Sequence, residues 1–554
     1  MDPQPFQIDW SFSNGFYNAP AWAVVPGTYR DSLNLWLKAQ NSVSDRGYST
    51  AGTGGGFPLY NCNEQAGGMS GGIGNGLIHL DIPWFAGSGN FLLDGASQGA
   101  STGKVMLRIG GVTYAAGLSK PGAAPGLAAS AAASSLINGA YAVAYSKYRQ
   151  TTGAVSSRSP ISLAVAARNK KLTVTLPADP GDGTTHYLLY GTRKNFGGSG
   201  VVFRITTVAA IPVTAGVQTV DIEYQDGDLG GLAPLANDPS PTCTHVAVLG
   251  DVVCAITVGG LIYPSLIGQP EAFDLTKVVR LPNGQAPTGV LHGVDGGVFV
   301  STRSSLVILI LTGVPDFPVL PRGVWSNTGF SHGNAFCLAG PELYGMSSSG
   351  LPVRTQGSKE PDYSFGEAVA KRMKDDGFTG ANAVVVHDEA NGCVLYCGPS
   401  ASLGGSVAWP FMLNNNRWGG PIRIAGTPNA AVAIGGLGKV QVGSQLYSLD
   451  SAGGNPSGGW FGQSAHQGAN GKIMTIDSYR AQASGAMIHD LLKDLTNTTI
   501  GGPFPLNFTP PHGDPAVQKL NDKCDSIALK ISGTIGNQQF YEAHIEGTVE
   551  PGTH

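Results

Sequence analysis

Short runs of alternating apolar and polar residues, each ended by a cluster of Gly, Ser, Asn or Pro, follow one another along most of this chain. Residues 141–145 and 171–176 alternate in this way, and residues 186–191 follow the turn signal Asp182-Gly183. Alternation with a period of two gives a strand with one buried face. The 81 glycines in 554 residues and the 13% of charged residues argue against a mainly helical chain. We therefore expect an all-β protein.

Beyond residue 245 the apolar runs recur at the spacing of a β-propeller. They cover residues 246–258, 290–311, 335–344, 383–396, 407–413 and 430–446. Tight-turn dipeptides such as Asp295-Gly296 and Asn391-Gly392 break them, as in serial hairpins. Serial hairpins predict radially repeated four-stranded sheets. No blade motif repeats strictly, so the number of blades stays open.

Composition divides the chain into four predicted regions. Residues 1–138 form an N-terminal β-rich region contributing to the propeller or a platform, with a strand at 32–37 and an Ala/Ser segment at 123–133 that is a linker or a short helix. Residues 139–234 form a two-sheet β-sandwich. Residues 235–475, which begin with the proline-containing hinge 235–241, form the propeller blades. Residues 476–554 hold a C-terminal helix and closing strands.

Two segments are predicted to be helical. Residues 364–373 begin with Ser364, which can cap the first turn, and have Glu367 three positions later. Residues 477–495 carry apolar residues at a spacing of three to four, namely Met487, Ile488, Leu491, Leu492 and Leu495. Both helices are expected to pack on a β-rich body.

The charge pattern and the N-terminus narrow the classes of partner. The net charge is −4 with no basic block, so no nucleic-acid-binding patch is visible. The missing patch does not exclude contact with DNA, because a channel through which DNA slides should itself avoid strong phosphate binding. Residues 1–5 lack the features of a secretory signal, and no 18-residue apolar stretch could span a bilayer. We expect no membrane span, and no glycan at the sequons of Asn497 and Asn507.

The seven cysteines are expected to be free thiols in a chain that folds in a reducing cytosol, because their number is odd and their spacing sparse. They are Cys62, Cys243, Cys254, Cys337, Cys393, Cys397 and Cys524. Cys393 and Cys397 would share a face of one strand, but about 13 Å apart, which is too far for a shared metal ion. All are interpreted as structural.

Three sequence patterns resemble catalytic or phosphate-binding motifs, but the residues around each of them do not fit such a site. Gly68-Met69-Ser70-Gly71-Gly72 has the spacing of a nucleophile elbow but no helix can start among the following glycines. Gly468-Ala469-Asn470-Gly471-Lys472 has the wrong glycine spacing for a phosphate loop, and Ile473 replaces its hydroxyl residue. The acidic pairs Asp375-Asp376 and Asp388-Glu389 border turn glycines and are expected in solvated loops rather than in a glycosidase site.

The histidines and tryptophans complete the candidates. His245, His292, His332 and His387 are dispersed, without metal-ligand spacing. Trp409, Trp418 and Trp460 lie near turns and could form a sugar-binding platform, although wedging between blades is favoured because each ring buries a large area. No catalytic, cofactor or metal residue is predicted, and we expect that the chain is not an enzyme.

Four segments together resemble tail nozzle proteins, the tail tubular-type proteins of short-tailed bacteriophages. They are residues 145–149, 152–157, 187–192 and 259–273, within a resemblance that covers roughly residues 130–350 by pattern and order. The resemblance implies a fibronectin type III-like or immunoglobulin-like sandwich before a propeller. This chain is shorter than the larger nozzle proteins, which implies a reduced platform for fibres or spikes.

The resemblance also implies a function without catalytic residues. Such a protein forms a homo-oligomer, a hexameric ring below the portal and adaptor of the virion tail, which retains the genome and lets double-stranded DNA pass on ejection. Its partners would be the adaptor and tail fibres or spikes, and the chain would be made in the host cytoplasm. The alternative is a propeller that binds or cleaves glycans in receptor recognition. Assembly into rings separates the two functions.

Overall fold

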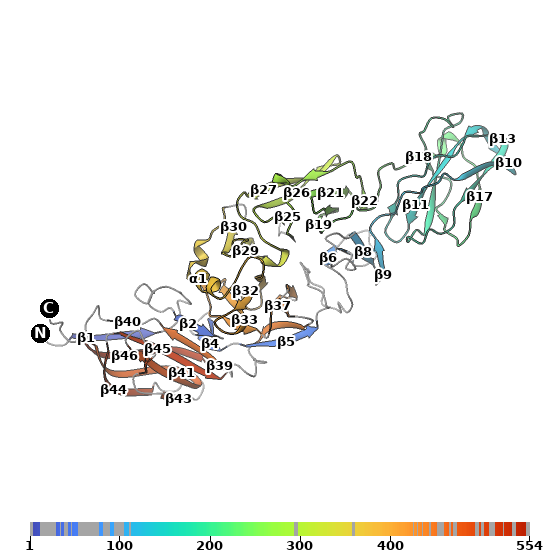
Figure 1. The fold of residues 1–554 in the computed structure, drawn as a ribbon. Helices are drawn as coiled ribbons and strands as arrows, with labels where there is room; N and C mark the ends of the chain where they lie inside the picture. Colours follow the sequence, from blue (N-terminus) through green and yellow to red (C-terminus); the bar gives the residue numbers. More distant parts are fainter. Residues whose placement is uncertain are drawn as a thin grey trace. The chain divides into compact units, whose positions relative to one another are not determined.

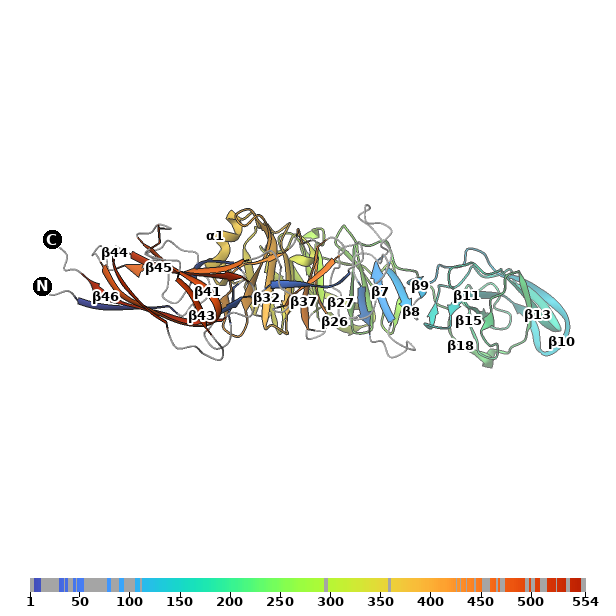
Figure 2. The same cartoon turned by 90° about the horizontal axis from the view of Figure 1, so that it is seen from below.

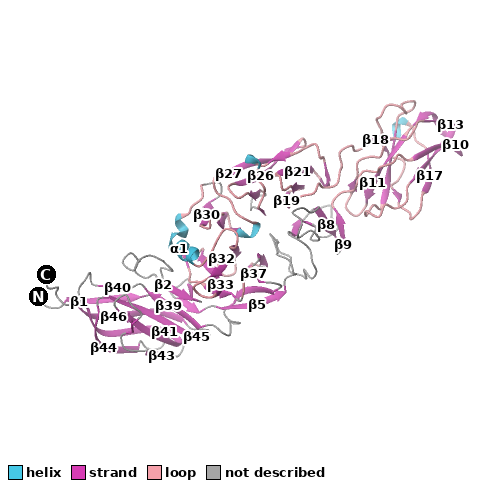
Figure 3. Ribbon diagram, viewed as in Figure 1, coloured by secondary structure: helices cyan, strands magenta, loops and turns pink. Residues whose placement is uncertain are grey.

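The computed structural model is an all-β structure (Figures 1 and 3), as predicted. It describes residues 4–10, 29–33, 35–37, 43–45, 47–53, 77–80, 89–93, 105–109, 112–292, 297–356, 360–424, 426–428, 430–434, 436–442, 445–450, 459–464, 467–468, 474–493, 498–499, 504–508, 516–524, 526–534 and 539–549. Within these ranges one α-helix is present, α1 (Glu367–Asp375).

The chain divides into two compact units, each described by itself. The first contains residues 1–72, 303–306 and 324–554, and the second contains residues 73–302 and 307–323. Long excursions of the chain therefore return to the same unit. The sandwich region belongs to the second unit, and the C-terminal strands belong to the first.

The second unit contains a two-sheet sandwich. One sheet has the order β10 (Gly126–Tyr141), β13 (Val165–Leu176) and β17 (Gln218–Ile222). The other has the order β12 (Ala154–Val155), β11 (Val143–Arg149), β14 (His186–Gly191), β15 (Phe203–Ile205) and β18 (Leu229–Leu232), with β16 (Ile211–Pro212) paired to β14. The strands predicted around residues 141–145, 171–176 and 186–191 are all present.

The sandwich core lies between the two sheets and is rich in aromatic rings. Tyr145 of β11 and Tyr187 of β14 meet edge to face at 5.3 Å between ring centroids, and Tyr141 meets Tyr224 at 5.5 Å. Leu172 and Val174 come from the opposite sheet and are fully buried. Alternate residues of each strand thus point inward, which is the arrangement that the sequence alternation predicts.

The Ala/Ser segment at 123–133 is neither a linker nor a helix, because residues 126–141 form the strand β10. The buried positions of this strand are Ser130, Ser134, Ile137 and Tyr141, three to four residues apart. Two register shifts against β13, between Ala129 and Ala133 and again before Asn138, insert extra residues. Such bulges convert a strand period of two into an apparent helical period.

Gly191 allows an aromatic ring to approach the backbone of β14. A Cβ atom at this position would overlap the hydroxyl end of Tyr224, whose Oη donates to Thr192 O at 3.0 Å. Tyr224 is fully buried. A glycine inside a strand often marks such a close approach.

We expect Gly191→Ala to lower the free energy of unfolding of the sandwich by about 1–3 kcal/mol, since the new methyl group must displace a packed ring. Urea denaturation followed by near-ultraviolet circular dichroism would measure the loss. Gly198→Ala is the matched control, because no atom lies within 4 Å of a Cβ there. An equal effect of the two substitutions would contradict the steric explanation.

The second unit also contains three small antiparallel sheets built from consecutive strands. The first has β6 (Leu77–Leu80), β7 (Gly89–Leu93), β8 (Val105–Ile109) and β9 (Val112–Ala115). The next has β19 (His245–Leu249), β20 (Val252–Ile256), β21 (Leu261–Leu266), β22 (Gln269–Phe273) and β23 (Val279–Arg280). The third has β24 (Gly289–His292), β25 (Val298–Ser301), β26 (Leu306–Val314) and β27 (Phe317–Trp325). Meanders of this size are typical of propeller blades.

The first unit contains three further small sheets. They comprise β28 (Phe336–Ala339), β29 (Glu342–Met346) and β30 (Pro352–Gln356); β31 (Val384–Asp388), β32 (Cys393–Ser400), β33 (Gly405–Met412), β34 (Arg417–Trp418) and β35 (Ile422–Ile424); and β36 (Ala430–Ile434), β37 (Leu437–Val442), β38 (Gln445–Asp450) and β5 (Gly47–Thr53). The N-terminal strand β5 thus completes the sheet that begins with β36. Small antiparallel sheets of the kind predicted from the serial hairpins are present in both units.

The helix predicted at 364–373 is present, but Ser364 does not cap it. A 3₁₀ turn over Ser364–Gly366 leads into α1, and no side chain caps the N-terminus of α1. Asp362 Oδ1 instead accepts hydrogen bonds from Ser364 N at 2.9 Å and Ser364 Oγ at 2.6 Å. Val369 and Met373 are the buried residues of α1 and pack into the core of the first unit.

The segment 477–495, predicted as a helix, lies almost wholly in the strand β41 (Met474–Lys493). Figures 1 and 2 show this strand within a large sheet made from both ends of the chain. Its other strands are β1 (Gln4–Trp10), β2 (Tyr29–Leu33), β3 (Leu35–Leu37), β4 (Val43–Asp45), β39 (Gly459–Ser464), β40 (Gln467–Gly468), β42 (Thr498–Thr499), β43 (Phe504–Phe508), β44 (Ala516–Cys524), β45 (Ser526–Thr534) and β46 (Gln539–Val549). Pairing of β41 with β43, β44, β45 and β46 overrides its local helical spacing.

Candidate interaction surface

A buried ion pair joins the sandwich to the sheet that follows it. Arg149 Nη1 at the end of β11 lies 2.6 Å from Glu271 Oε2 in β22, and the two side chains are 0% and 4% exposed. Arg149 also donates to the carbonyl oxygens of Ala115, Asp182 and Gly183, and Gly117 N donates to Glu271 Oε2 at 3.1 Å. These bonds replace part of the hydration that the two groups lose, while Glu271 Oε1 is buried without a hydrogen bond from the described residues. The pair holds two distant segments together in the interior.

A second, more exposed ion pair lies beside the first. Lys147 Nζ donates to Asp182 Oδ2 at 2.7 Å and to Ser119 Oγ at 2.9 Å. Partial burial opposes ionisation of Asp182, but the hydrogen bonds from Lys147 and Thr184 outweigh it and hold the pKa of this carboxyl below its usual value. Asp182 therefore stays ionised at neutral pH.

The predicted hinge at 235–241 is clamped by hydrogen bonds on both sides. Asn237 N donates to Ser157 Oγ at 2.9 Å, and Asn237 Nδ2 donates to Val155 O and to Gln269 Oε1. Asp238 forms a β-bridge with Phe273. This segment is therefore a fixed connection, and the sandwich is joined to β22 at several points.

Five exposed apolar side chains gather at one edge of the sandwich, and we call them the sandwich patch. They are Leu163, Phe196, Val201, Leu232 and Leu235, with exposed fractions between 45% and 89%. Residues 163–164 lie against the loop of Phe196, since a Cβ on Gly197 would stand 2.7 Å from Ala164 Cβ. Val201 and Leu232 are neighbours because Val202 O accepts from Ala233 N and Phe203 pairs with Leu232.

Arg158 connects the parts of the sandwich patch. Its backbone N donates to Pro234 O at 2.8 Å, and its guanidinium donates to Ser159 O and Gly200 O. The carbonyl bonds leave the positive charge without a carboxylate among the contacts described. The sandwich patch thus combines exposed apolar side chains with a positive charge on a firmly attached module.

The sequence did not indicate this site as a whole. Arg149 and Glu271 each lie in a segment that carries the nozzle resemblance, but nothing in the sequence pairs two residues 122 positions apart. Charged residues are rare in this chain, and a charged residue inside an apolar strand needs a partner. This feature could have singled out Arg149 and Glu271. Four of the five patch residues lie in loops, where apolar character is unusual, and Leu232 ends β18.

Two acidic residues expected in solvated loops are buried instead. Asp376 is 2% exposed; its Oδ1 accepts from Ser402 N at 3.2 Å, and its Oδ2 lies 3.6 Å from Arg372 Nε. Asp388 is fully buried and binds the backbone N and the amide of Asn391. Their neighbours Asp375 and Glu389 are exposed. The buried carboxylates shape turns, because short acidic side chains satisfy nearby backbone N–H groups.

The other candidates remain apart from one another or lie outside the described residues. Several candidates lie outside the described residues: the elbow at 68–72, residues 469–473, Cys62, and the side chains of His292, Trp460 and Cys524. Burial lowers the pKa of His245 to about 4 and also lowers the pKa values of His332 and His387. In the described part of the chain, no three His, Cys, Asp or Glu side chains gather as metal ligands.

The described cysteines are free thiols, as predicted. They are Cys243, Cys254, Cys337, Cys393 and Cys397. Cys393 and Cys397 lie in the same strand, β32, and both are buried. Burial raises the pKa of Cys243 to about 12 and that of Cys397 still further, so these thiols are unreactive at neutral pH.

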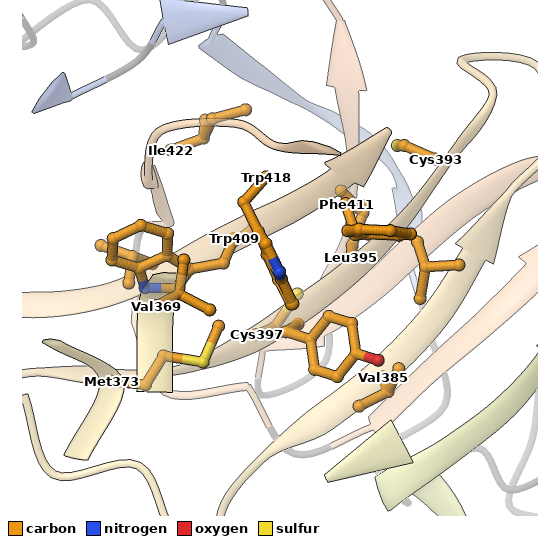
Figure 4. Close-up of a cluster of buried hydrophobic side chains, with 14 of the residues drawn as sticks. Val369, Met373, Val385, Cys393, Leu395, Cys397, Trp409, Phe411, Trp418 and Ile422 are labelled. Atoms are coloured by element: carbon orange, nitrogen blue, oxygen red, sulfur yellow. The ribbon is translucent and has the colours of Figure 1, made fainter. Parts of the chain in front are cut away.

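Trp409 and Trp418 lie in the interior of the first unit and do not form a sugar platform (Figure 4). Trp409 is fully buried and Trp418 is 3% exposed. Trp418 Nε1 donates to Phe365 O at 2.7 Å, and its ring stacks on Phe365 at 5.5 Å. The packing interpretation of these two tryptophans is therefore correct.

Comparisons with known proteins give likenesses of fold at low similarity. No family model matches the chain, and no curated protein gives a significant match. The extracellular domain of a B. thetaiotaomicron one-component system matches 64% of this chain with a TM-score of 0.26 at 11% identity, and the chain spans 45% of that domain. The WD40 domain of Toxoplasma gondii coronin matches 58% of this chain and 88% of its own length, with a TM-score of 0.25 at 11% identity.

A glycoside hydrolase is also among the similar structures. A family 43 arabinoxylan arabinofuranohydrolase from Bacillus subtilis matches 69% of this chain and 93% of its own length, with a TM-score of 0.15 at 9% identity. At these values the likenesses do not indicate an activity. Separately, no described helix is long and apolar enough to cross a membrane. The chain is an all-β protein of propeller type with a β-sandwich.

Proposed function

We propose that this chain is a structural subunit of a virion tail, of the nozzle type, which forms a hexameric ring around the path of the viral DNA. The observation that carries the proposal is the sandwich patch on a module fixed by the Arg149–Glu271 pair. A surface that holds subunits in register needs exposed apolar area on a firmly attached support.

The resemblance of residues 130–350 to nozzle proteins supports the same function. Its segments at 145–149 and 259–273 supply Arg149 and Glu271, the two partners of the buried pair. The resemblance therefore includes residues that attach the sandwich to β22.

The mechanism would be passive. The ring would be held below the adaptor by contacts between subunits, and loops at its inner edge would narrow the channel until contact with a host moves them. The net charge of −4 suits a channel wall, because each neutralised phosphate would add affinity and slow the passage of DNA.

The test is the assembly state of the purified chain and its place in the particle. We expect light scattering after size exclusion and negative-stain images to show rings of six copies. An antibody against the chain should label the tail of short-tailed particles. A monodisperse monomer that binds or cuts a polysaccharide would overturn the proposal.

The alternative, a propeller that binds or cleaves glycans, makes the opposite prediction. Trp409 and Trp418 cannot contact a sugar without unpacking the core of the first unit. The side chain of Trp460 lies outside the described residues, so it is the remaining member of that set. Glycan-array binding that is lost in Trp460→Ala, together with a monomeric state, would favour the alternative.

A further inference from the structure

The hairpin of β26 and β27 ends in a group of exposed apolar side chains. Leu311 and Val314 of β26 are 42% and 49% exposed, and Phe317 and Leu320 of β27 are 70% and 52% exposed. The first half of β26 is buried, whereas its last four residues are exposed. The distal part of β26 thus lacks the packing that covers its base, whereas in β27 the buried Pro318 and Val319 lie between the exposed Phe317 and Leu320.

A neighbouring loop extends this surface. Lys277 Nζ donates to Asp316 Oδ1 at 2.9 Å and to Pro315 O at 3.3 Å, which brings the loop with Leu275 and Val278 to the hairpin tip. These two apolar residues are each 42% exposed. We call the six apolar residues, Leu275, Val278, Leu311, Val314, Phe317 and Leu320, the hairpin patch. The side chain of Asp316, in the turn between β26 and β27, is 77% exposed.

We propose that the hairpin patch of one copy of this chain docks on the sandwich patch of the next copy, with Asp316 facing Arg158. The inference rests on the proposed function, for which it names the contact that would join neighbouring subunits. Both patches belong to the second unit and share no residue.

The symmetry of a ring indicates that a second copy of this chain binds each patch. A ring of identical subunits uses a heterologous contact, which needs two different and complementary surfaces on every subunit. Among the described residues, the second unit carries two such groups of exposed apolar side chains, of five and six members. A contact of each patch with itself would produce dimers or open assemblies instead of one closed ring.

Charge complementarity gives the contact its direction. The guanidinium of Arg158 lies beside the loops that carry the sandwich patch, and its described hydrogen bonds go to carbonyl oxygens. The carboxylate of Asp316 lies in the turn between β26 and β27, and its bond to Lys277 is largely exposed and therefore weak. Docking would place these opposite charges together inside an apolar surround, which fixes orientation more than it adds affinity.

The hairpin is suited to side-chain contact rather than to strand addition. The edge strand β27 contains Pro318 and Pro321, which cannot donate backbone hydrogen bonds. Prolines on an edge strand block pairing with a further strand. The exposed rings and aliphatic groups are therefore the features that a partner can bind.

A charge swap tests the proposed pair. Arg158→Glu alone and Asp316→Arg alone should each weaken association of the full-length chain about 100-fold, because each brings like charges together in the contact. The double variant should recover most of the loss. Lys171→Glu and Asp375→Arg are the matched controls, since both change exposed charges outside the two patches. Mass photometry across a dilution series would measure association.

Mixing of two variants tests the direction. Leu163→Ser and Phe317→Ser should each be monomeric, and an equal mixture should form dimers of one copy each, because one intact patch of each kind remains. Circular dichroism would verify that both variants fold. Rings that persist in both variants and in both single charge variants would overturn the inference and leave the proposed function standing. A monomeric wild-type chain would overturn both, and rings that label no tail would overturn the proposed function alone.

Discussion

Glu271→Ala is expected to lower the free energy of unfolding of the second unit by about 3–5 kcal/mol, because it leaves the guanidinium of Arg149 buried without its counter-charge. Arg149 is fully buried and cannot rotate into water without opening the contact between the sandwich and β22. The loss of stability should be confined to the segments around the ion pair. Hydrogen exchange measured by mass spectrometry should show faster exchange in residues 115–119 and 269–273.

The exposed pair of Lys171 and Glu223 provides the control for this substitution. Their side chains are 32% and 36% exposed at a separation of 3.2 Å, so Glu223→Ala should cost less than about 1 kcal/mol. The double replacement of Arg149 by Met and Glu271 by Leu should cost less than Glu271→Ala, since it buries no charge. A loss for Glu271→Ala no larger than that for Glu223→Ala would contradict the role assigned to the buried pair.

Trp409→Ala is expected to destabilise the first unit by about 3–5 kcal/mol, because it removes the largest fully buried side chain of the described residues and leaves a cavity. Trp409 lies in β33 opposite Tyr396 of β32, and both strands are almost wholly buried. Faster hydrogen exchange in β32 and β33 should therefore accompany the loss.

Hydrogen exchange also separates a packing role of Trp409 from a role in ligand binding. The exposed Val258 is the control, and Val258→Ala should change stability by less than about 0.5 kcal/mol. Because this protein has several domains, local exchange reports the effect better than one unfolding midpoint. Unchanged exchange in Trp409→Ala, together with loss of glycan binding, would contradict the packing role.

Much of the fold could be predicted because strands with one or two buried faces leave a direct mark on the sequence. The run at 141–145 lies at the end of β10 and in β11, and the run at 186–191 forms β14. The run at 383–396 lies mostly in β31 and β32. Turn dipeptides such as Asn391-Gly392 also fall between strands, with Gly392 at a φ of 63°. These features depend on local sequence alone.

The two wrong interpretations have different physical causes. Two register shifts in β10, within residues 129–138, place its buried positions three to four residues apart. In β41, residues 485–493 pair with β43 and β45 without a register shift, so strand pairing overrides the apolar spacing there. Local sequence reveals neither a bulge nor a partner strand.

The candidate site depended on tertiary pairing and was therefore beyond local reasoning. Arg149 and Glu271 meet only because β11 and β22 come together, and the sandwich patch combines residues from several turns. Asp376 and Asp388 were misplaced for a similar reason, since an acidic residue beside a glycine can bond a buried turn as well as face solvent. Trp409 and Trp418 were placed correctly, because their large area favours burial wherever a core exists, while Trp460 stays a prediction.

The pairing of β5 with β38 imposes an order in time on the synthesis of this protein. Tyr48 pairs with Leu449, so residues at the two ends of this ladder are made roughly 400 positions apart. At about 5–20 residues per second, the early strand waits roughly 20–80 s on the ribosome before its partner exists. A nascent chain therefore cannot complete this sheet before residues 445–450 have been made.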